Sequence, residues 1–354
     1  MNSPIEKQPD DISLGNVMVV LASFVILVAG MKAASSILVP FLLAVFIAII
    51  TTPIFIGLQN KGIPSIAALL ALIMGLIVVC VLMVGVIGTS LSDFTNKMPA
   101  YQQKLQKQTT DVMTWLKEKG VDTSDDIITD AFNPQAIMGY VGSLVSTLSG
   151  LLSNAFLILL IVIFMLLEAA ILPIKVRELP GLSKETSDRL DGVVENIRQY
   201  MGLKTVISLF TGLLIGALMA AMGVDFAILL GLLAFLLNYV PSVGSIIAAI
   251  PGVLLAVVQF GFTKALIVAG IYMAINVTVG NVIEPRVMGR GLGLSPMVIV
   301  LSMIFWGWVL GPVGMLLSVP LTMAVKIGLE SGSDTRWIAL LMGAAPARKA
   351  DKSC

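Results

Sequence analysis

A glutamate and an arginine flank a proline between two long apolar runs, at Glu284, Pro285 and Arg286. Charged side chains are costly in apolar surroundings, and proline disturbs helical hydrogen bonding. Two interpretations remain: a surface loop where the chain leaves an apolar phase, or a gating and coupling pair that exchanges partners between states. Arg290, between two glycines, is a candidate alternate partner. Glu168 is a weaker candidate for the same role, because an interfacial position explains it as well.

Two breaks rich in proline and glycine lie on either side of this motif. Each has a proline, a glycine two or three residues later, and a short apolar stretch that reaches a second proline, over 241–251 and 312–320. Broken helices expose unpaired backbone groups that suit a polar solute or ion, although ordinary surface turns leave the same pattern. We predict that both breaks, with nearby asparagines, line a substrate path. The residues of this path are Asn238, Pro241, Gly244, Asn276, Asn281, Gly311, Pro312 and Gly314.

The chain lacks the residues and motifs of most enzymes. It has no histidine, which excludes imidazole bases and histidine metal ligands. Cys80 lies in an apolar run and Cys354 is the last residue, a pattern that indicates neither a disulfide framework nor a metal site. Phosphate-binding loops, nucleophile elbows and zinc-protease signatures are missing from the sequence. We therefore expect no enzymatic activity, no catalytic residues, no metal and no cofactor.

The composition is that of a membrane protein. Of the 354 residues, 57% are hydrophobic and only 12% charged, whereas a soluble domain is about a quarter charged. The sequence therefore predicts an all-α polytopic integral membrane protein. The N-terminus carries acidic as well as basic residues and runs into a long apolar segment, so we expect no cleavable signal. The net charge of +1 gives no indication of nucleic acid as a partner.

Apolar runs of membrane-spanning length recur along the chain. A span needs about 20 apolar residues, and we expect spans at 17–31, 33–56, 65–91, 145–171, 201–222, 265–283, 294–310 and 313–329. The run 226–260 is too long for one span and is interrupted at 238–244, which predicts two half-helices. We therefore expect eight full spans plus a re-entrant or broken hairpin, with ten spans as the alternative. In the fifth span, Thr211, Gly212, Gly216 and Ala220 should allow another helix to approach closely.

Polar segments divide the membrane region. The division that we expect is 1–91 for a three-span region, 92–143 for a periplasmic helical segment and 144–174 for the fourth span, followed by 175–199 for a cytoplasmic amphipathic segment, 200–329 for the membrane core and 330–354 for a cytoplasmic tail. The side that holds both termini carries more lysine and arginine than the other side. Cytoplasmic loops carry such an excess, so we expect both termini in the cytoplasm.

The segment 92–143 contains an amphipathic helix. Its apolar residues recur at spacings of three and four, which indicates a heptad-like stripe. The stripe either packs on its own protein or joins copies of the chain in an oligomer. Its residues are Phe94, Met98, Tyr101, Leu105, Val112 and Trp115.

The C-terminal half also resembles a known family. The runs 238–251, 284–295 and 306–321, which include both breaks and the Glu284–Arg286 motif, are similar to the autoinducer-2 exporter family of bacterial membrane proteins. The resemblance covers nearly the whole chain. It implies a multi-pass protein of the bacterial inner membrane that exports a small furanone-type signal, autoinducer-2, and that forms a homo-oligomer such as a pentamer. Some relatives act instead as sodium or lithium/proton antiporters.

Three functions are consistent with these features. The first is a secondary exporter of a small polar signal, which the broken elements and the resemblance favour. The second is a cation/proton antiporter that uses Glu284, Arg286 or Glu168. The third is an oligomeric membrane scaffold without transport, whose amphipathic helix recruits partners. In all three, the lipid bilayer and further copies of the chain are the expected contacts.

Overall fold

The structure is a computed structural model that describes residues 14–118, 154–169, 184–241, 243–288, 293–332 and 335–343, with a few isolated positions between 139 and 150. Within these residues the secondary structure is helical and contains no strand. The helices are α1 (Leu14–Ala33), α2 (Ser35–Asn60), α3 (Ser65–Glu118), α6 (Ala155–Ala169), α8 (Lys184–Ala221), α9 (Ala227–Leu237), α10 (Val243–Phe260), α11 (Phe262–Thr278), the π-helix η1 (Val279–Ile283), α12 (Glu284–Met288), α13 (Pro296–Leu310), α14 (Pro312–Ser331) and α15 (Arg336–Met342).

Each apolar segment predicted from the sequence contains an apolar helix, and in the predicted segment 145–171 this is α6, while most of 145–153 lies outside the described residues. Six of the described helices are long and apolar enough to cross a membrane, and four shorter apolar helices accompany them. The protein is therefore all-α and polytopic, as predicted. Helix α9 has 11 residues and is about 17 Å long, so it cannot cross a hydrocarbon core of about 30 Å by itself. Its length favours the broken hairpin over ten full spans.

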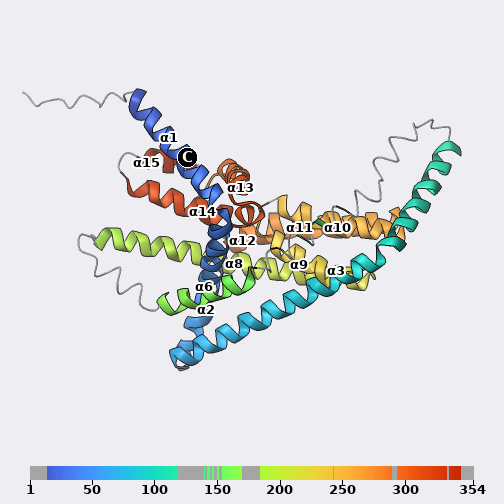
Figure 1. Cartoon of the computed structure of the whole chain (residues 1–354), viewed down its shortest axis with the longest axis horizontal. Coiled ribbons are helices and arrows are strands. Elements are labelled where there is room, and N and C mark those ends of the chain that lie inside the picture. The colour runs from blue at the N-terminus through green and yellow to red at the C-terminus, as the bar shows by residue number, and fades with distance from the viewer. Residues whose placement is uncertain are drawn as a thin grey trace, which may run out of the picture.

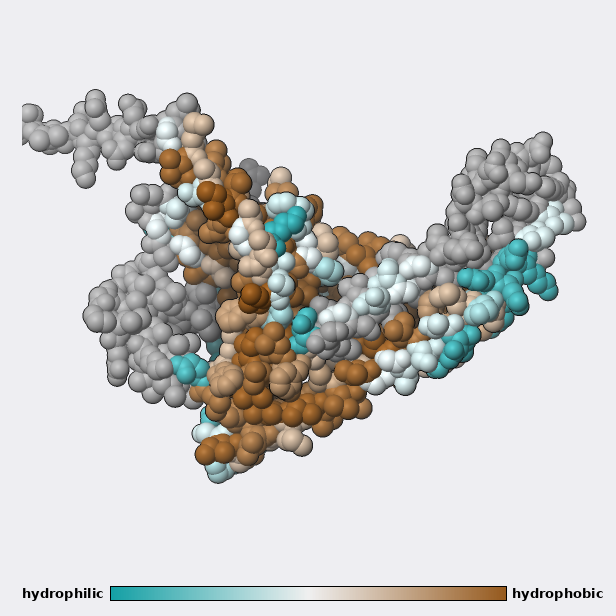
Figure 2. All heavy atoms as spheres, viewed as in Figure 1, coloured by the Kyte–Doolittle hydropathy of each residue, from teal (hydrophilic) through white to brown (hydrophobic). Residues whose placement is uncertain are grey.

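Helix α3 extends far beyond the rest of the molecule. Its 54 residues give a length of about 80 Å, more than twice the hydrocarbon thickness. It continues without interruption from the predicted third span into the predicted extramembrane segment and ends at one side of the molecule (Figure 1). Apolar side chains cover the lower part of the molecule, whereas hydrophilic side chains gather toward the far end of α3 (Figure 2).

Helices α8 and α9 form a tight hairpin, as the small residues of the fifth span predict. A methyl group added at Gly212 would lie 2.7 Å from the carbonyl oxygen of Gly231, and one added at Gly231 would lie 2.7 Å from the carbonyl oxygen of Gly212. Glycine on both helices therefore brings the two backbones together. The predicted role of Gly212 is confirmed.

The hairpin α10–α11 follows α9 and lies beside it (Figure 1). The chain turns at Asn238–Pro241 between α9 and α10, where the sequence predicts the break, and turns again at Gly261 between α10 and α11. Buried residues of α8, α9, α10 and α11 share one apolar cluster, which also contains Phe94 and Tyr101 of α3. This packing holds the break next to α8 and the extension of α3 next to the hairpins.

Candidate functional site

Lys204 of α8 and Glu284 of α12 form an ion pair inside the protein. The Lys204 amine Nζ donates to the Glu284 carboxylate oxygen Oε1 at 2.5 Å. The side chain of Lys204 is 3% exposed, whereas that of Glu284 is 25% exposed. A buried ammonium that lost its only compensating charge would be strongly unfavourable, so the lysine depends on the glutamate more than the reverse. The pair joins the interior of one candidate span, Glu195–Ala221, to the end of another, Phe262–Val287.

The backbone before Glu284 is a π-helix. In η1, the amide of Glu284 donates to the carbonyl oxygen of Val279, five residues earlier. Pro285 follows in the first turn of α12, where a missing N–H is tolerated. The disturbance expected from Pro285 therefore occurs one turn before it. Turns of π-helix are rare in proteins, and those that occur are often found at functional sites.

The structure pairs Glu284 with Lys204 instead of Arg286. Side chains two residues apart on a helix point in different directions. Arg286, two residues after Glu284, is exposed. No ion pair joins Arg286 to another described residue. Arg290, the predicted alternate partner, lies outside the described residues. Glu168 is exposed near the end of α6, as an interfacial residue would be.

Polar side chains of α8 continue from the ion pair toward the first break. Asn238 is buried and its Nδ2 donates to Ser208 Oγ at 3.0 Å. The hydroxyl of Tyr239 donates to Thr205 Oγ1 at 2.8 Å. Lys204, Thr205 and Ser208 lie within one turn of α8, so the ion pair and the break share one polar layer. Of the predicted path residues, Asn238 is the one that joins this layer.

The other predicted path residues lie in different surroundings. Asn276 donates to the Ser245 carbonyl oxygen at 3.3 Å, between α11 and α10. Asn281 is exposed in η1, Pro312 is exposed at the start of α14, and Pro241 is partly buried in the first turn. Their contact with a substrate remains a prediction.

The two predicted glycines after the breaks have a packing role. A methyl group at Gly244 would collide with the Leu237 carbonyl oxygen, and one at Gly314 would collide with the Trp306 carbonyl oxygen. Gly311, at the second break, has φ +71°, which glycine adopts without strain. These contacts alone explain the glycines, whether or not a solute passes.

The second break meets the first through apolar packing. Tyr239 of the first break shares a buried cluster with Val313 and Leu317 of α14. Behind the second break, the indole nitrogen of Trp306 donates to Thr322 Oγ1 at 3.0 Å. Both breaks therefore border the same buried cluster, whose residues are largely apolar.

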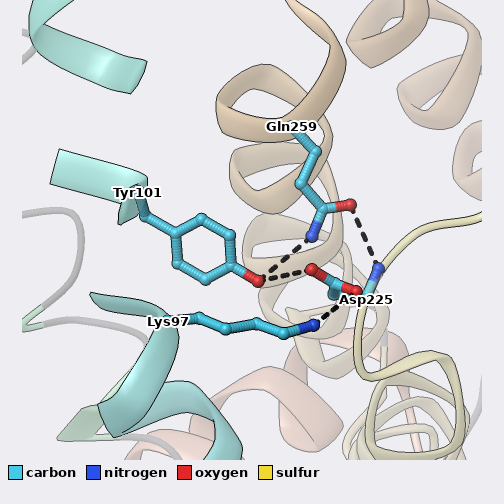
Figure 3. Close-up of polar contacts among 4 residues, drawn as sticks. All are labelled: Lys97, Tyr101, Asp225 and Gln259. Carbon is cyan, nitrogen blue, oxygen red and sulfur yellow. Dashed lines mark hydrogen bonds and ion pairs between the residues drawn. The ribbon is translucent and has the colours of Figure 1, made fainter. Parts of the chain in front are cut away.

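A second polar cluster, which the sequence analysis missed, ties α3 to the α8–α9 turn. Asp225 accepts from the Lys97 amine at 2.9 Å and from the Tyr101 hydroxyl at 2.6 Å (Figure 3). Gln259 of α10 completes it, since its Nε2 donates to the Tyr101 oxygen at 3.4 Å and its Oε1 accepts from the Asp225 amide at 3.1 Å. We call these four residues the α3 clamp. They come from three distant parts of the chain, so no local spacing signals them.

The α3 clamp holds a strained turn and lowers the pKa of the Asp225 carboxyl. Phe226, next to Asp225, has φ +60°, which is unfavourable for a bulky residue, and its ring packs edge-on against Phe94 of α3. Partial burial alone would raise the pKa of the Asp225 carboxyl. The hydrogen bonds from Tyr101 and Lys97 and the charges of Lys97 and Lys104 outweigh that effect, so the pKa lies below its ordinary value of 3.8.

The described residues contain no cluster of three or more histidine, cysteine or acidic side chains that could hold a metal ion. The polar layer offers amide and hydroxyl groups, one ammonium and one carboxylate. That set suits recognition and charge exchange.

Comparison with known proteins gives the family. The model of the AI-2E family transporter matches residues 21–334. The chain is 41% identical over 326 residues to the AI-2 transport protein TqsA of Escherichia coli K12, covering 92% of this chain and 95% of TqsA. It is 40% identical to a protein of Haemophilus influenzae whose name gives transport as a provisional role, covering 94% and 98% of the two chains. This bacterial multi-pass chain therefore belongs to the AI-2E family of membrane transporters.

Proposed function

We propose that this protein is a secondary transporter of the bacterial inner membrane that exports a small polar signalling molecule, autoinducer-2, with both termini in the cytoplasm. The name and the 41% identity of TqsA over nearly its full length support the substrate. The buried Lys204–Glu284 pair beside a broken helix carries the proposal on the structural side. Charged residues inside membrane segments commonly mark substrate or ion pathways.

In this proposal the ion pair is a gate. Glu284 sits on the five-residue helix α12, behind a π-turn, whereas Lys204 sits inside the 38-residue helix α8. The end of a helix behind a π-turn moves at lower cost than the middle of a long helix, so opening would swing Glu284 away from Lys204. Lys204 then needs another acceptor, and the amide and hydroxyl groups of Asn238, Ser208 and Thr205 are within the same layer. A polyhydroxylated solute would supply such acceptors while it passes.

Cation/proton antiport is the second candidate, and the partial exposure of the Glu284 carboxylate favours it specifically. Glu284 retains 25% exposure while its partner is buried. A cation or proton that reached the carboxylate would therefore compete directly with Lys204. Proteoliposomes should then show sodium-dependent proton flux that Glu284→Gln abolishes, and a lack of flux in the unmodified protein would remove this candidate.

Assembly into a homo-oligomer with α3 as an interface also belongs to the proposal. Phe94 and Tyr101 pack inside the chain's own core, together with partly buried Met98. The start of the apolar stripe is thus used within one chain, so a second copy would have to bind the stripe beyond residue 101. A scaffold role would require this far end to recruit partners without transport. Truncation of the far end with transport intact would separate scaffold and transporter.

The proposed export is tested by measuring extracellular autoinducer-2 in cultures of cells with and without the gene. The expected result is a lower extracellular and a higher intracellular level in cells without the gene. Equal levels in both cultures would refute export of this molecule. Restoration by the wild-type gene, but not by the Glu284→Gln variant, would connect the result to the gate.

A further inference from the structure

A tyrosine in the seam between α10 and α11 carries a hydroxyl without a partner. Tyr272 is one of the largest fully buried side chains, with 2% exposure. Its hydroxyl is buried and has no hydrogen bond to any described residue. A buried polar group without a partner is unfavourable and rare in folded proteins. Phenylalanine would fill the same space without that penalty, so packing alone does not explain a tyrosine here.

The opposite helix is shaped around this hydroxyl. A methyl group at Gly252 of α10 would lie 2.7 Å from the Tyr272 oxygen and 2.8 Å from its ring. Glycine at this position therefore makes room for the tyrosine hydroxyl.

Polar contacts continue along the seam. Asn276 follows Tyr272 by four residues and so lies on the same face of α11. Its Nδ2 donates to the carbonyl oxygen of Ser245, at 3.3 Å. Ser245 precedes Gly252 by seven residues, which is two helical turns along one face of α10. The unpartnered hydroxyl is therefore a buried polar group in a seam whose other polar contact, at Ser245, lies near the first break.

We propose that the Tyr272 hydroxyl binds a hydroxyl group of a small neutral polyhydroxylated solute. The inference rests on the proposed transport of such a solute and assigns one of its contacts. The Tyr272 hydroxyl can both donate and accept a hydrogen bond and carries no charge, so it suits hydroxyl-bearing neutral solutes better than anions.

The experiment compares Tyr272→Phe with Tyr101→Phe in inside-out membrane vesicles and in purified protein. The probe is autoinducer-2, and the readouts are the half-saturating concentration for accumulation and the melting temperature. Tyr272→Phe should raise the half-saturating concentration by roughly three- to tenfold, the loss of one neutral hydrogen bond, without lowering the melting temperature. Tyr101→Phe removes a hydroxyl that already has partners, so it should lower the melting temperature and leave the half-saturating concentration unchanged.

Each other outcome overturns the assignment. An unchanged half-saturating concentration in Tyr272→Phe would mean that the hydroxyl does not contact the solute. A lower melting temperature, or failure of Tyr272→Phe to fold, would mean that the hydroxyl holds the fold. If wild-type vesicles do not accumulate autoinducer-2, the proposed substrate is wrong, and the site is then tested with glycerol, ribitol and ribose. These polyols should raise the melting temperature of the wild type more than that of Tyr272→Phe, and equal effects would overturn the site.

Discussion

The Lys204 amine and the Glu284 carboxylate lie 2.5 Å apart although 80 positions separate them in the chain. One comes from the interior of the long helix α8 and the other from the short helix behind a π-turn. Since Lys204 is almost completely buried and Glu284 is not, the two charges contribute unequally to stability. That asymmetry can be measured.

Loss of the carboxylate should be more harmful than loss of the amine. Glu284→Gln leaves a buried ammonium without compensation and should destabilise the protein by about 3–5 kcal/mol. Lys204→Met should cost less, because the partly exposed carboxylate keeps access to its surroundings. The double variant should recover most of the lost stability. Thermal or denaturant unfolding of the four proteins in one detergent checks this order, and additive losses in the double variant would contradict a direct pair.

The α3 clamp should respond to acid. The pKa of Asp225 is lowered in the folded protein. Its contribution to the free energy of unfolding is therefore fully present above the pKa of the unfolded state, near 3.8, and is lost as the pH falls through the lower pKa of the folded state. Asp225→Asn should therefore reduce the melting temperature at pH 6–8 by a constant amount, and the difference from wild type should shrink below about pH 4. The exposed neighbour Asp93→Asn serves as the control. A difference at pH 3 that is as large as the difference at pH 7 would contradict the clamp.

The glycines after the two breaks should not tolerate a side chain. Gly244→Ala and Gly314→Ala place a methyl group against a backbone carbonyl oxygen that cannot move without the helix, and each should destabilise the protein by about 1–3 kcal/mol. Gly270→Ala, inside α11 with open space around it, should be neutral or stabilising by about 0.5–1 kcal/mol. Unfolding of the three variants checks the contrast. Equal effects at Gly244 and Gly270 would show that Gly244 does not lie against the Leu237 carbonyl oxygen.

If the far part of α3 joins copies of the chain, Leu105→Glu should weaken assembly. A carboxylate at an apolar interface would be desolvated without a partner. Gln106→Glu introduces the same charge at an exposed neighbouring position and is the matched control. The mass of the detergent-solubilised protein should fall for Leu105→Glu alone. An unchanged mass would place the interface elsewhere.

The sequence predicts the helices well because apolar length and proline position determine them locally. The broken hairpin at 238–244 and the close approach at Gly212 both follow from residue types that act within one or two turns. The boundary between a span and a polar segment is less visible, since α3 and α8 each continue through it as one helix. The backbone hydrogen bonds of a helix form in lipid as well as in water, so a change from apolar to polar side chains along the chain does not end a helix.

The site was only partly accessible from the sequence. Glu284 stood out because it is charged in apolar surroundings, and Lys204 has the same property inside the predicted fifth span, a signal that the sequence analysis did not use. The choice of Arg286 as partner relied on nearness in the chain, whereas tertiary packing decided the pair. The α3 clamp could not be predicted, because Lys97 and Asp225 are 128 positions apart and both are ordinary surface residue types.

Transport by the purified protein tests the central claim most directly. Proteoliposomes that contain the wild type, Glu284→Gln or no protein are given autoinducer-2 on one side, and its appearance on the other side is followed in time. We predict movement with the wild type and none above protein-free liposomes with Glu284→Gln, provided that the variant is folded at the assay temperature. Wild-type liposomes that pass autoinducer-2 no faster than protein-free ones would contradict the account, and a folded Glu284→Gln that transports at the wild-type rate would contradict the gate.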